Sequence, residues 1–369
     1  MRAQSGPRLG VLVAACALAL GLVADLSADR APSAPQAGAT SNTYLFNDSH
    51  FHLTNYIQEG ITAKDFLKIM ADKVGRSTLF GIPLQQTWSY GNTGDFAPWY
   101  YTQTDAPLYY YSFTDAYIAM QYRSLTKEEQ ARFDPMITGF DPADMYAADH
   151  IKRVLKTFPG VFEGIGEFTV HKEFVSPKVA GETASLTNPA LDRIFDFTAE
   201  AGLVSILHND VDMPFPKPGQ DPYQLVQLYD LFKRHPKSTI IWAHCGLGRI
   251  VRPVHDQIAL VERALNNPEL NHVSIDISWD EVAKYIVATP ETIQAVADVI
   301  NRHPDRFLFG SDEVAPTEQA KYLKVYDMYA PLFAKLTPEA SEKLRKGNYE
   351  RLFDEARRRV RAWEQANTR

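Results

Sequence analysis

The sequence predicts an α/β protein built as a (β/α)8 TIM barrel, with an aromatic-rich insertion after the second strand and extra C-terminal helices. From Leu45 onward, short apolar runs of strand length alternate with amphipathic helical segments, and eight such runs occur. The 369 residues, 45% of them hydrophobic, can bury the core of a barrel in one domain. An open doubly wound sheet would carry a glycine-rich turn after its first strand, whereas this chain has His50-Phe51-His52 there.

The N-terminal residues have the composition of an export signal. Arg2 and Arg8 precede an apolar stretch from Val11 to Ala24, which is shorter than a membrane span. We expect a signal peptide over residues 1–28, a flexible Ala/Ser/Pro/Gly-rich linker over 29–43 and the barrel over 44–365. The product would be periplasmic or secreted. An uncleaved signal anchor, or lipidation at Cys16 within a lipobox-like stretch, would instead hold it in the cell envelope.

The first half of the barrel is expected to contain four strands. A helix with Thr62 as its cap follows the first strand, and Asp141-Pro142 ends the third. The expected strands are Leu45 to Leu53, Ser77 to Leu84, Phe133 to Phe140 and Val161 to Phe168, with helices over Thr62 to Val74, Ala143 to Thr157 and Pro189 to Ala201.

The second half repeats the pattern. A turn of Cys245, Gly246, Leu247 and Gly248 follows the sixth strand and precedes a helix. The expected strands are Leu203 to His208, Thr239 to His244, His272 to Ile277 and Arg306 to Gly310. Helices are expected over Tyr223 to Arg234, Glu291 to Arg302, Ala320 to Leu332 and Pro338 to Trp363.

The segment from Trp88 to Tyr122 is unusually aromatic and too long for an ordinary connection. Large rigid side chains with polar tips suit the wall or lid of a binding pocket, so Trp88 and Trp99 are candidate substrate contacts. The same composition suits an interface between subunits, and a homo-oligomer is the alternative.

Metal-competent residues stand where the strands end. His50 and His52 are two residues apart on one strand, so their side chains emerge on one face and can grip one ion. The C-terminal ends of barrel strands converge on one mouth, where active sites are built. We therefore expect these two histidines to meet the other residues at strand ends, which are Glu167, His208, His244 and Asp312.

These motifs resemble the amidohydrolase superfamily, in particular the amidohydrolase-2 branch that includes carboxymuconate-semialdehyde decarboxylase-like enzymes. The resemblance covers nearly all of Leu45 to Phe353. The matching motifs are Asp48-Ser49-His50-Phe51-His52, Gly164-Ile165-Gly166-Glu167, Leu207-His208, Ala243-His244-Cys245-Gly246, Gly310-Ser311-Asp312 and Gly347-Asn348-Tyr349.

The resemblance implies that His50, His52, His208 and Asp312 bind one divalent ion, most often zinc. It also implies that Asp312 is a general base and that His244 either polarises the substrate carbonyl or ligates a second ion. In some superfamily members a carboxylate on the fourth strand bridges two metals, so Glu167 either bridges two ions or orients a ligand imidazole from outside the donor set. The site thus holds one ion or two.

The expected function is metal-dependent hydrolysis of an amide, ester or lactone-type bond in a small, aromatic or hydrophobic substrate. Arg249, placed at the start of the helix after the sixth strand, is a candidate for binding a substrate carboxylate, with a surface salt bridge as the alternative. Other readings are non-oxidative decarboxylation of an aromatic or unsaturated acid, and an inactive binding protein of the envelope. A net charge of -7 gives no basic surface, so nucleic acid is not an expected partner.

Overall fold

The structure, a computed structural model, describes residues 44–54, 60–82, 111–172, 185–212, 222–249 and 251–367. The expected signal peptide and linker (1–43), Trp88 and Trp99 lie outside these residues, so the predictions about them stay predictions. In the part of the chain that is described, no helix combines the length and the apolar character needed to cross a membrane.

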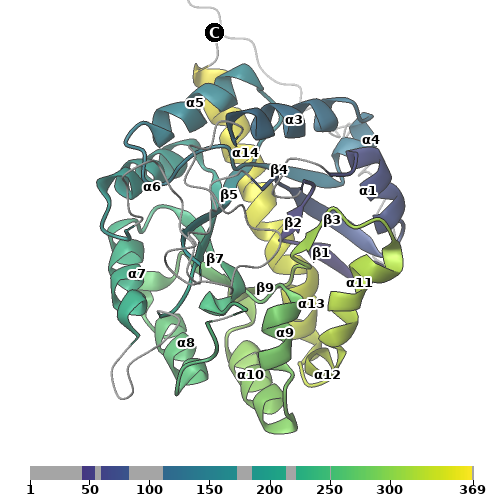
Figure 1. Ribbon diagram of the computed structural model, residues 1–369, viewed down its shortest axis with the longest axis vertical. Coiled ribbons are helices and arrows are strands. Elements are labelled where there is room, and N and C mark those ends of the chain that lie inside the picture. Colours follow the sequence, from purple (N-terminus) through teal and green to yellow (C-terminus); the bar gives the residue numbers. More distant parts are fainter. Residues whose placement is uncertain are drawn as a thin grey trace, which may run out of the picture. The chain divides into compact units, whose positions relative to one another are not determined.

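Eight parallel strands form one curled sheet whose strands follow the order of the chain. A second, two-stranded sheet pairs β10 (Glu313–Val314) with β2 (Phe51–His52), again in parallel. Because β2 follows the first strand of the large sheet and β10 follows the last, this pair joins the two and completes a (β/α)8 barrel (Figure 1). The strands of the large sheet are β1 (Phe46–Asp48), β3 (Val74–Leu79), β4 (Phe133–Ile137), β5 (Gly164–His171), β6 (Val204–Asn209), β7 (Thr239–Trp242), β8 (Val273–Asp276) and β9 (Phe307–Leu308).

Helices cover the outside of the barrel (Figure 1). Short 3-10 turns lie at η2 (Ala243–Gly246), η3 (Pro268–Leu270) and η4 (Pro304–Arg306), and η5 (Lys343–Gly347) is a π-helical turn. The described α-helices are α1 (Ala63–Met70), α3 (Tyr111–Arg123), α4 (Lys127–Gln130), α5 (Ala147–Thr157), α6 (Pro189–Ala201), α7 (Tyr223–Arg234), α8 (Gln257–Leu265), α9 (Asp280–Ile286), α10 (Pro290–Arg302), α11 (Gln319–Met328), α12 (Ala330–Phe333), α13 (Pro338–Glu342) and α14 (Asn348–Asn367).

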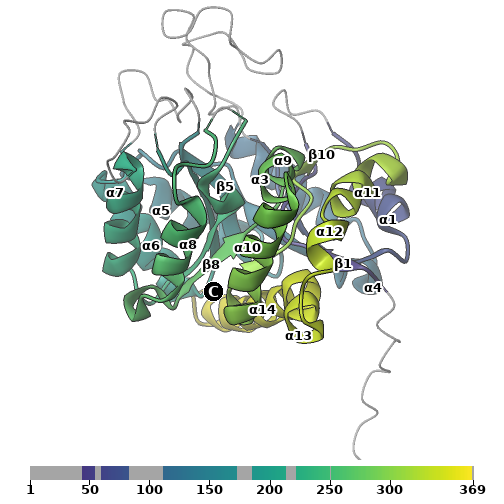
Figure 2. The ribbon, with the colours of Figure 1, turned by 90° about the horizontal axis from the view of Figure 1, so that it is seen from below.

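Helix α14 closes the N-terminal mouth of the barrel. Tyr349 and Phe353 of this helix pack in one cluster with Met136 and Ile206, which come from the strands. The Tyr349 hydroxyl also donates to Asp134 Oδ2 near the start of β4 over 2.6 Å. Figure 2 shows α13 and α14 gathered at one end of the strands. The opposite mouth, at the carboxyl ends of the strands, is left for a functional site.

Two predicted boundaries in the first βα unit were wrong. The expected strand from Leu45 to Leu53 is broken into β1 and β2, because the Asp48 carboxylate accepts from the backbone N–H of His50 over 3.0 Å and turns the chain there. The expected helix ends at Met70 rather than Val74, because Ala71 has a φ of +43° and cannot continue it. Strand β3 consequently begins at Val74, three residues before the predicted start.

The C-terminal helices are more divided than predicted. The expected helix over Pro338 to Trp363 consists of α13, the π turn η5 and α14, and Pro331 separates α11 from α12 because it lacks the N–H that a continuous helix needs. Helix α9 was not predicted. Asn348 donates from Nδ2 to the carbonyls of Pro304 and Phe307 over 2.7 and 2.8 Å, which ties α14 to the barrel as expected of a structural residue.

Candidate metal centre

The six predicted ligand residues are shielded from solvent, and all but Glu167 lie at or just beyond the carboxyl ends of strands. Glu167 is in the middle of β5, which runs on to His171 rather than ending at Phe168 as predicted. His50 lies between β1 and β2, and His52 ends β2. Glu167 comes from β5 and His208 from β6, both buried. His244 lies in η2 directly after β7, and Asp312 precedes β10 with its side chain only 8% exposed.

Left-handed backbone positions aim two of these side chains. His244, Cys245 and Gly246 have φ values of +59°, +56° and +68°, so the chain turns sharply after β7. Asp312 has a φ of +52°, and its backbone N–H donates to the His50 carbonyl over 2.8 Å. A left-handed conformation costs a non-glycine residue about 1–2 kcal/mol. Packing of the surrounding fold offsets this free-energy cost at His244 and Asp312, which are candidate ligands. Strained backbone of this kind is common at functional sites.

The Nε2 atoms of His50 and His52 each lie close to an oxygen of both carboxylates. His50 Nε2 lies 3.3 Å from Asp312 Oδ1 and 3.6 Å from Glu167 Oε2. His52 Nε2 lies 3.1 Å from Asp312 Oδ1 and 3.5 Å from Glu167 Oε2. Tetrahedral zinc with bonds of about 2.0–2.2 Å places its donors roughly 3.3–3.6 Å apart. Among the described residues, no hydrogen-bond partner satisfies the buried His50 Nε2. His50, His52 and Asp312 therefore offer three donor atoms close enough to share one ion, and His50, Glu167 and His244 form a second such group.

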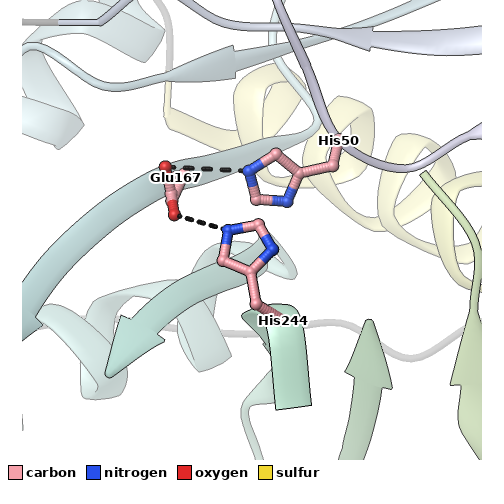
Figure 3. Close-up of side chains that lie close together, drawn as sticks. All are labelled: His50, Glu167 and His244. Carbon is pink, nitrogen blue, oxygen red and sulfur yellow. Dashed lines mark hydrogen bonds and ion pairs between the residues drawn. The ribbon is translucent and has the colours of Figure 1, made fainter. Parts of the chain in front are cut away.

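The other oxygen of each carboxylate faces a second pair of histidines. Glu167 Oε1 lies 2.6 Å from His208 Nδ1 and 3.3 Å from His244 Nε2. Asp312 Oδ2 lies 3.9 Å from His244 Nε2. Figure 3 shows Glu167 between His50 and His244, with one carboxylate oxygen directed at each ring. Glu167 and Asp312 thus each present one oxygen to His50 and the other to His244.

Each ligand histidine has a partner on its other ring nitrogen. His50 Nδ1 donates to Asp276 Oδ2 over 2.7 Å, and His52 Nδ1 donates to the Gly81 carbonyl over 3.3 Å. Such partners set the tautomer and the orientation of a metal-binding imidazole. In His50 and His52 they place the proton on Nδ1 and leave Nε2 as the donor to a metal. The corresponding contacts in the second pair are His208 Nε2 to Asp210 Oδ1 (3.2 Å) and His244 Nδ1 to Ser278 Oγ (3.0 Å).

Asp48 joins the two loops that carry His50 and Asp312. Its Oδ1 accepts from the backbone N–H groups of His50 (3.0 Å) and Ser311 (2.8 Å). Its Oδ2 accepts from Ser311 Oγ and Tyr322 Oη, both over 2.6 Å. Burial raises the pKa of Asp48 to about 6, although these hydrogen bonds oppose the rise. Because both carboxylate oxygens of Asp48 accept hydrogen bonds, Asp48 positions the loops of the candidate ligands His50 and Asp312 and is not itself a candidate ligand.

The charges favour a cation. Burial alone would raise the pKa of Glu167 and Asp312, but the neighbouring cations and histidines outweigh it and lower both values, so the two carboxylates are ionised. Burial would lower the pKa of His50, yet Asp312 and Glu167 raise it well above its ordinary value. Burial, followed by the charge of His50, lowers the pKa of His244 and keeps that ring neutral. Ionised carboxylates and the neutral His244 ring are forms that bind metal, whereas at His50 a bound cation would replace the proton that the two carboxylates favour.

Arg249 does not open a helix as predicted, since α8 begins only at Gln257. Its Nε lies 3.4 Å from Glu281 Oε1, and its guanidinium lies 5.2 Å from the Trp279 ring centroid. The Trp279 ring in turn lies 5.0 Å from the His244 ring. Arg249 is therefore one aromatic ring away from the centre and takes part in an ion pair, and its contact with a substrate stays a prediction.

Several residues of the centre were not found from the sequence. Asp276 and Ser278 follow the apolar run of β8, and the strand-end rule that selected Asp312 would also have selected them. Lys172, at the end of β5, is buried with its Nζ 5.2 Å from the Trp279 ring centroid, and its charge helps to lower the pKa of Glu167.

Comparison with known proteins identifies a family and a shared fold. A family model described as amidohydrolase matches residues 48–354. An uncharacterised TIM-barrel protein from Bordetella bronchiseptica superposes with a TM-score of 0.51 at 14% identity, covering 84% of this chain and 99% of that chain. An amidohydrolase II gives a TM-score of 0.50 at 14% identity, with 84% and 99% covered.

A third structure, an apo protein from Agrobacterium tumefaciens, gives a TM-score of 0.50 at 11% identity, covering 84% of this chain and 93% of that one. At these identities the likenesses show the barrel fold alone. No curated protein is significantly similar to this chain.

Proposed function

Because the chain belongs to the amidohydrolase family, we propose that it is a hydrolase that uses two divalent cations, most readily zinc, to cleave an amide, ester or lactone-type bond of a small substrate. The observation that carries the proposal is the orientation of Glu167 and Asp312. Each carboxylate turns one oxygen towards His50 and the other towards His244.

The donor set suits such ions. Imidazole nitrogens and carboxylate oxygens are ligands that zinc accepts in catalytic sites. His50 and His52 would hold one ion, His208 and His244 the other, with Glu167 and Asp312 between them. When bound, such ions polarise a carbonyl group and lower the pKa of water so that hydroxide forms near neutral pH.

Asp312 is the proposed base. Its low pKa keeps it ionised at neutral pH, and it follows the carboxyl end of β9, next to His50 and His52. Oδ1 faces His50 and His52 within 3.3 Å, whereas Oδ2 lies 3.9 Å from His244 Nε2, beyond hydrogen-bond distance. We assign Oδ2 to accept the proton of the attacking water and to return it to the leaving group, which general acid–base catalysis requires. Ser278 and Asp276 keep the rings of His244 and His50 oriented during this step.

The test measures the metal content of the purified full-length chain and of its variants Glu167→Gln and His50→Ala. The control variant is Glu269→Gln, on the exposed turn η3. We expect two equivalents of zinc in the wild type and in the control, and about one in Glu167→Gln. A panel of amides, esters and lactones, screened in parallel, should reveal hydrolysis that is lost in His50→Ala.

One equivalent that is unaffected by Glu167→Gln would overturn the two-ion site. Release of carbon dioxide from aromatic or unsaturated acids, with no hydrolysis of the panel, would replace the hydrolase by a decarboxylase. A chain that takes up no metal and turns over nothing would be a binding protein.

A further inference from the structure

A cavity of about 730 Å³ lies on the outer side of the barrel, where helices α8 and α10 face β8 and β9. Helices α8, α9 and α10 contribute its walls, and Figure 2 shows α8 and α10 on either side of β8. Most of the lining is apolar. The apolar side chains of the lining include Leu247, Val254, Ile258, Ile277, Val296 and Val299.

The inner wall of the cavity is the reverse side of the metal centre. Cys245 lines the cavity, while His244, the residue before it, faces Glu167. Ile277 lines the cavity, while its neighbours Asp276 and Ser278 contact His50 and His244. The same two stretches of backbone therefore serve the ligands on one side and the cavity on the other.

Within the described ranges, three carboxylates and one cation line the cavity, and the cation is paired. Arg302 Nε lies 2.6 Å from Glu262 Oε1, and Asp298 Oδ1 accepts from Gln294 Nε2 over 2.8 Å. Deeper in, Gln257 Nε2 donates to the Cys245 carbonyl over 3.1 Å. With its cation paired, the rim has little to attract an anion, and the apolar walls favour a molecule without charge.

We propose that this cavity is a second binding site, distinct from the metal centre, that takes a neutral apolar small molecule. Its volume lies within the range of about 300–1,000 Å³ that holds ligands of drug size. Burial of apolar surface drives binding there, and the excess of carboxylates over cations in the lining disfavours an anionic ligand. An occupant would rest against the Cys245 turn and so against the backbone that holds His244.

The test uses the neutral dye Nile red, whose fluorescence rises in apolar surroundings, titrated into the full-length protein. Ala295→Trp, on the cavity side of α10, fills the space, and Glu291→Trp, on the exposed first turn of the same helix and outside the lining, is the matched control. We expect saturable binding of about one dye per chain, weakened at least tenfold in Ala295→Trp and unchanged in Glu291→Trp. Ile258→Trp fills the cavity from α8 and replaces Ala295→Trp if that variant does not fold.

Charged dyes complete the experiment. An anionic naphthalene sulfonate should compete with Nile red at least tenfold more weakly than a neutral aromatic of similar size. Dye binding that is not saturable, that survives both filling variants, or that prefers the anion would overturn the proposal. None of these readouts depends on bound metal or on turnover, so the proposal stands or falls independently of the proposed function.

Discussion

Replacing Asp276 by asparagine should weaken metal binding without disturbing the fold. Asp276 Oδ2 accepts from His50 Nδ1 over 2.7 Å, and Oδ1 accepts from the Ser278 backbone N–H over 2.5 Å. Asparagine has only one carbonyl oxygen for these two donors. If it keeps the Ser278 N–H, its amide nitrogen faces His50 Nδ1, and the imidazole proton must move to Nε2. A protonated Nε2 has no lone pair for a metal, so His50 ceases to be a ligand.

The size of the effect follows from the same geometry. Hydrogen bonds to charged groups are worth about 1.5–3 kcal/mol, and loss of the partner of a metal-binding histidine lowers metal affinity by about 10–100-fold. A factor of 10–100 is about 1.4–2.8 kcal/mol, so the two estimates agree. We therefore expect Asp276→Asn to raise the dissociation constant for the zinc ion that His50 would hold by about 10–100-fold.

Competition between the protein and a zinc-chelating dye at pH 7.5 measures this change. Asp327→Asn, an exposed carboxylate on α11, is the control for the loss of one negative charge. Thermal unfolding of the metal-free proteins checks that the variant folds. Zinc affinity within twofold of the wild type in a folded Asp276→Asn would refute the assignment of the His50 tautomer, and with it the assignment of Nε2 as the donor.

Three further predictions concern the base, the Asp48 junction and the pH dependence of stability. Asp312→Asn should lower kcat on any hydrolysed substrate at least about 100-fold, the lower range for loss of a general base, and a full rate would place the base elsewhere. Tyr322→Phe removes a donor to Asp48 and should cost about 1.5–3 kcal/mol in urea unfolding at pH 7.5, whereas no change would show that this bond is not stabilising. Burial lowers the pKa of His272 from 6.5, despite its bond to the Phe232 carbonyl, so the unfolded chain binds the proton more readily and stability falls as the pH drops from about 6.5. Melting curves of His272→Gln should fall less steeply between pH 7 and 5, and curves parallel to the wild type would contradict this.

The barrel and its order of elements could be predicted because the alternation of apolar runs and amphipathic segments is a local property of the chain. The strand ends that carry the candidate ligands could be located in the same way. The rule that strand ends converge on one mouth selected Glu167, His208 and Asp312, which are distant in the sequence, and the structure brings them together around the His50 and His52 pair.

What the sequence could not provide was the direction of each side chain. The break between β1 and β2 depends on an Asp48 carboxylate that bends back to its own backbone, and composition does not reveal that bond. The role of Asp276 depends on a 2.7 Å contact with His50 across the barrel. Helix α14 closes the N-terminal mouth of the barrel through the tertiary packing of Tyr349 and Phe353. A helical sequence pattern does not show where in the fold such a helix packs.

The sequence left two roles open for Glu167, and the side-chain directions favour one of them. A residue that only orients a ligand imidazole bonds to the nitrogen that faces away from the metal, as Asp276 does to His50 Nδ1 and the Gly81 carbonyl does to His52 Nδ1. Glu167 Oε2 instead approaches His50 Nε2 and His52 Nε2, the nitrogens on the opposite side of each ring, at 3.6 and 3.5 Å. His50 Nε2 has no hydrogen-bond partner among the residues that the structure describes, and a carboxylate oxygen beside it could bind the same cation. In that position the carboxylate would be a ligand and not an orienting group. Its other oxygen lies 3.3 Å from His244 Nε2 and 2.6 Å from His208 Nδ1. The contact with His208 is a hydrogen bond that orients that ring, so the bridge proposed above rests on the contacts of Glu167 with His50, His52 and His244.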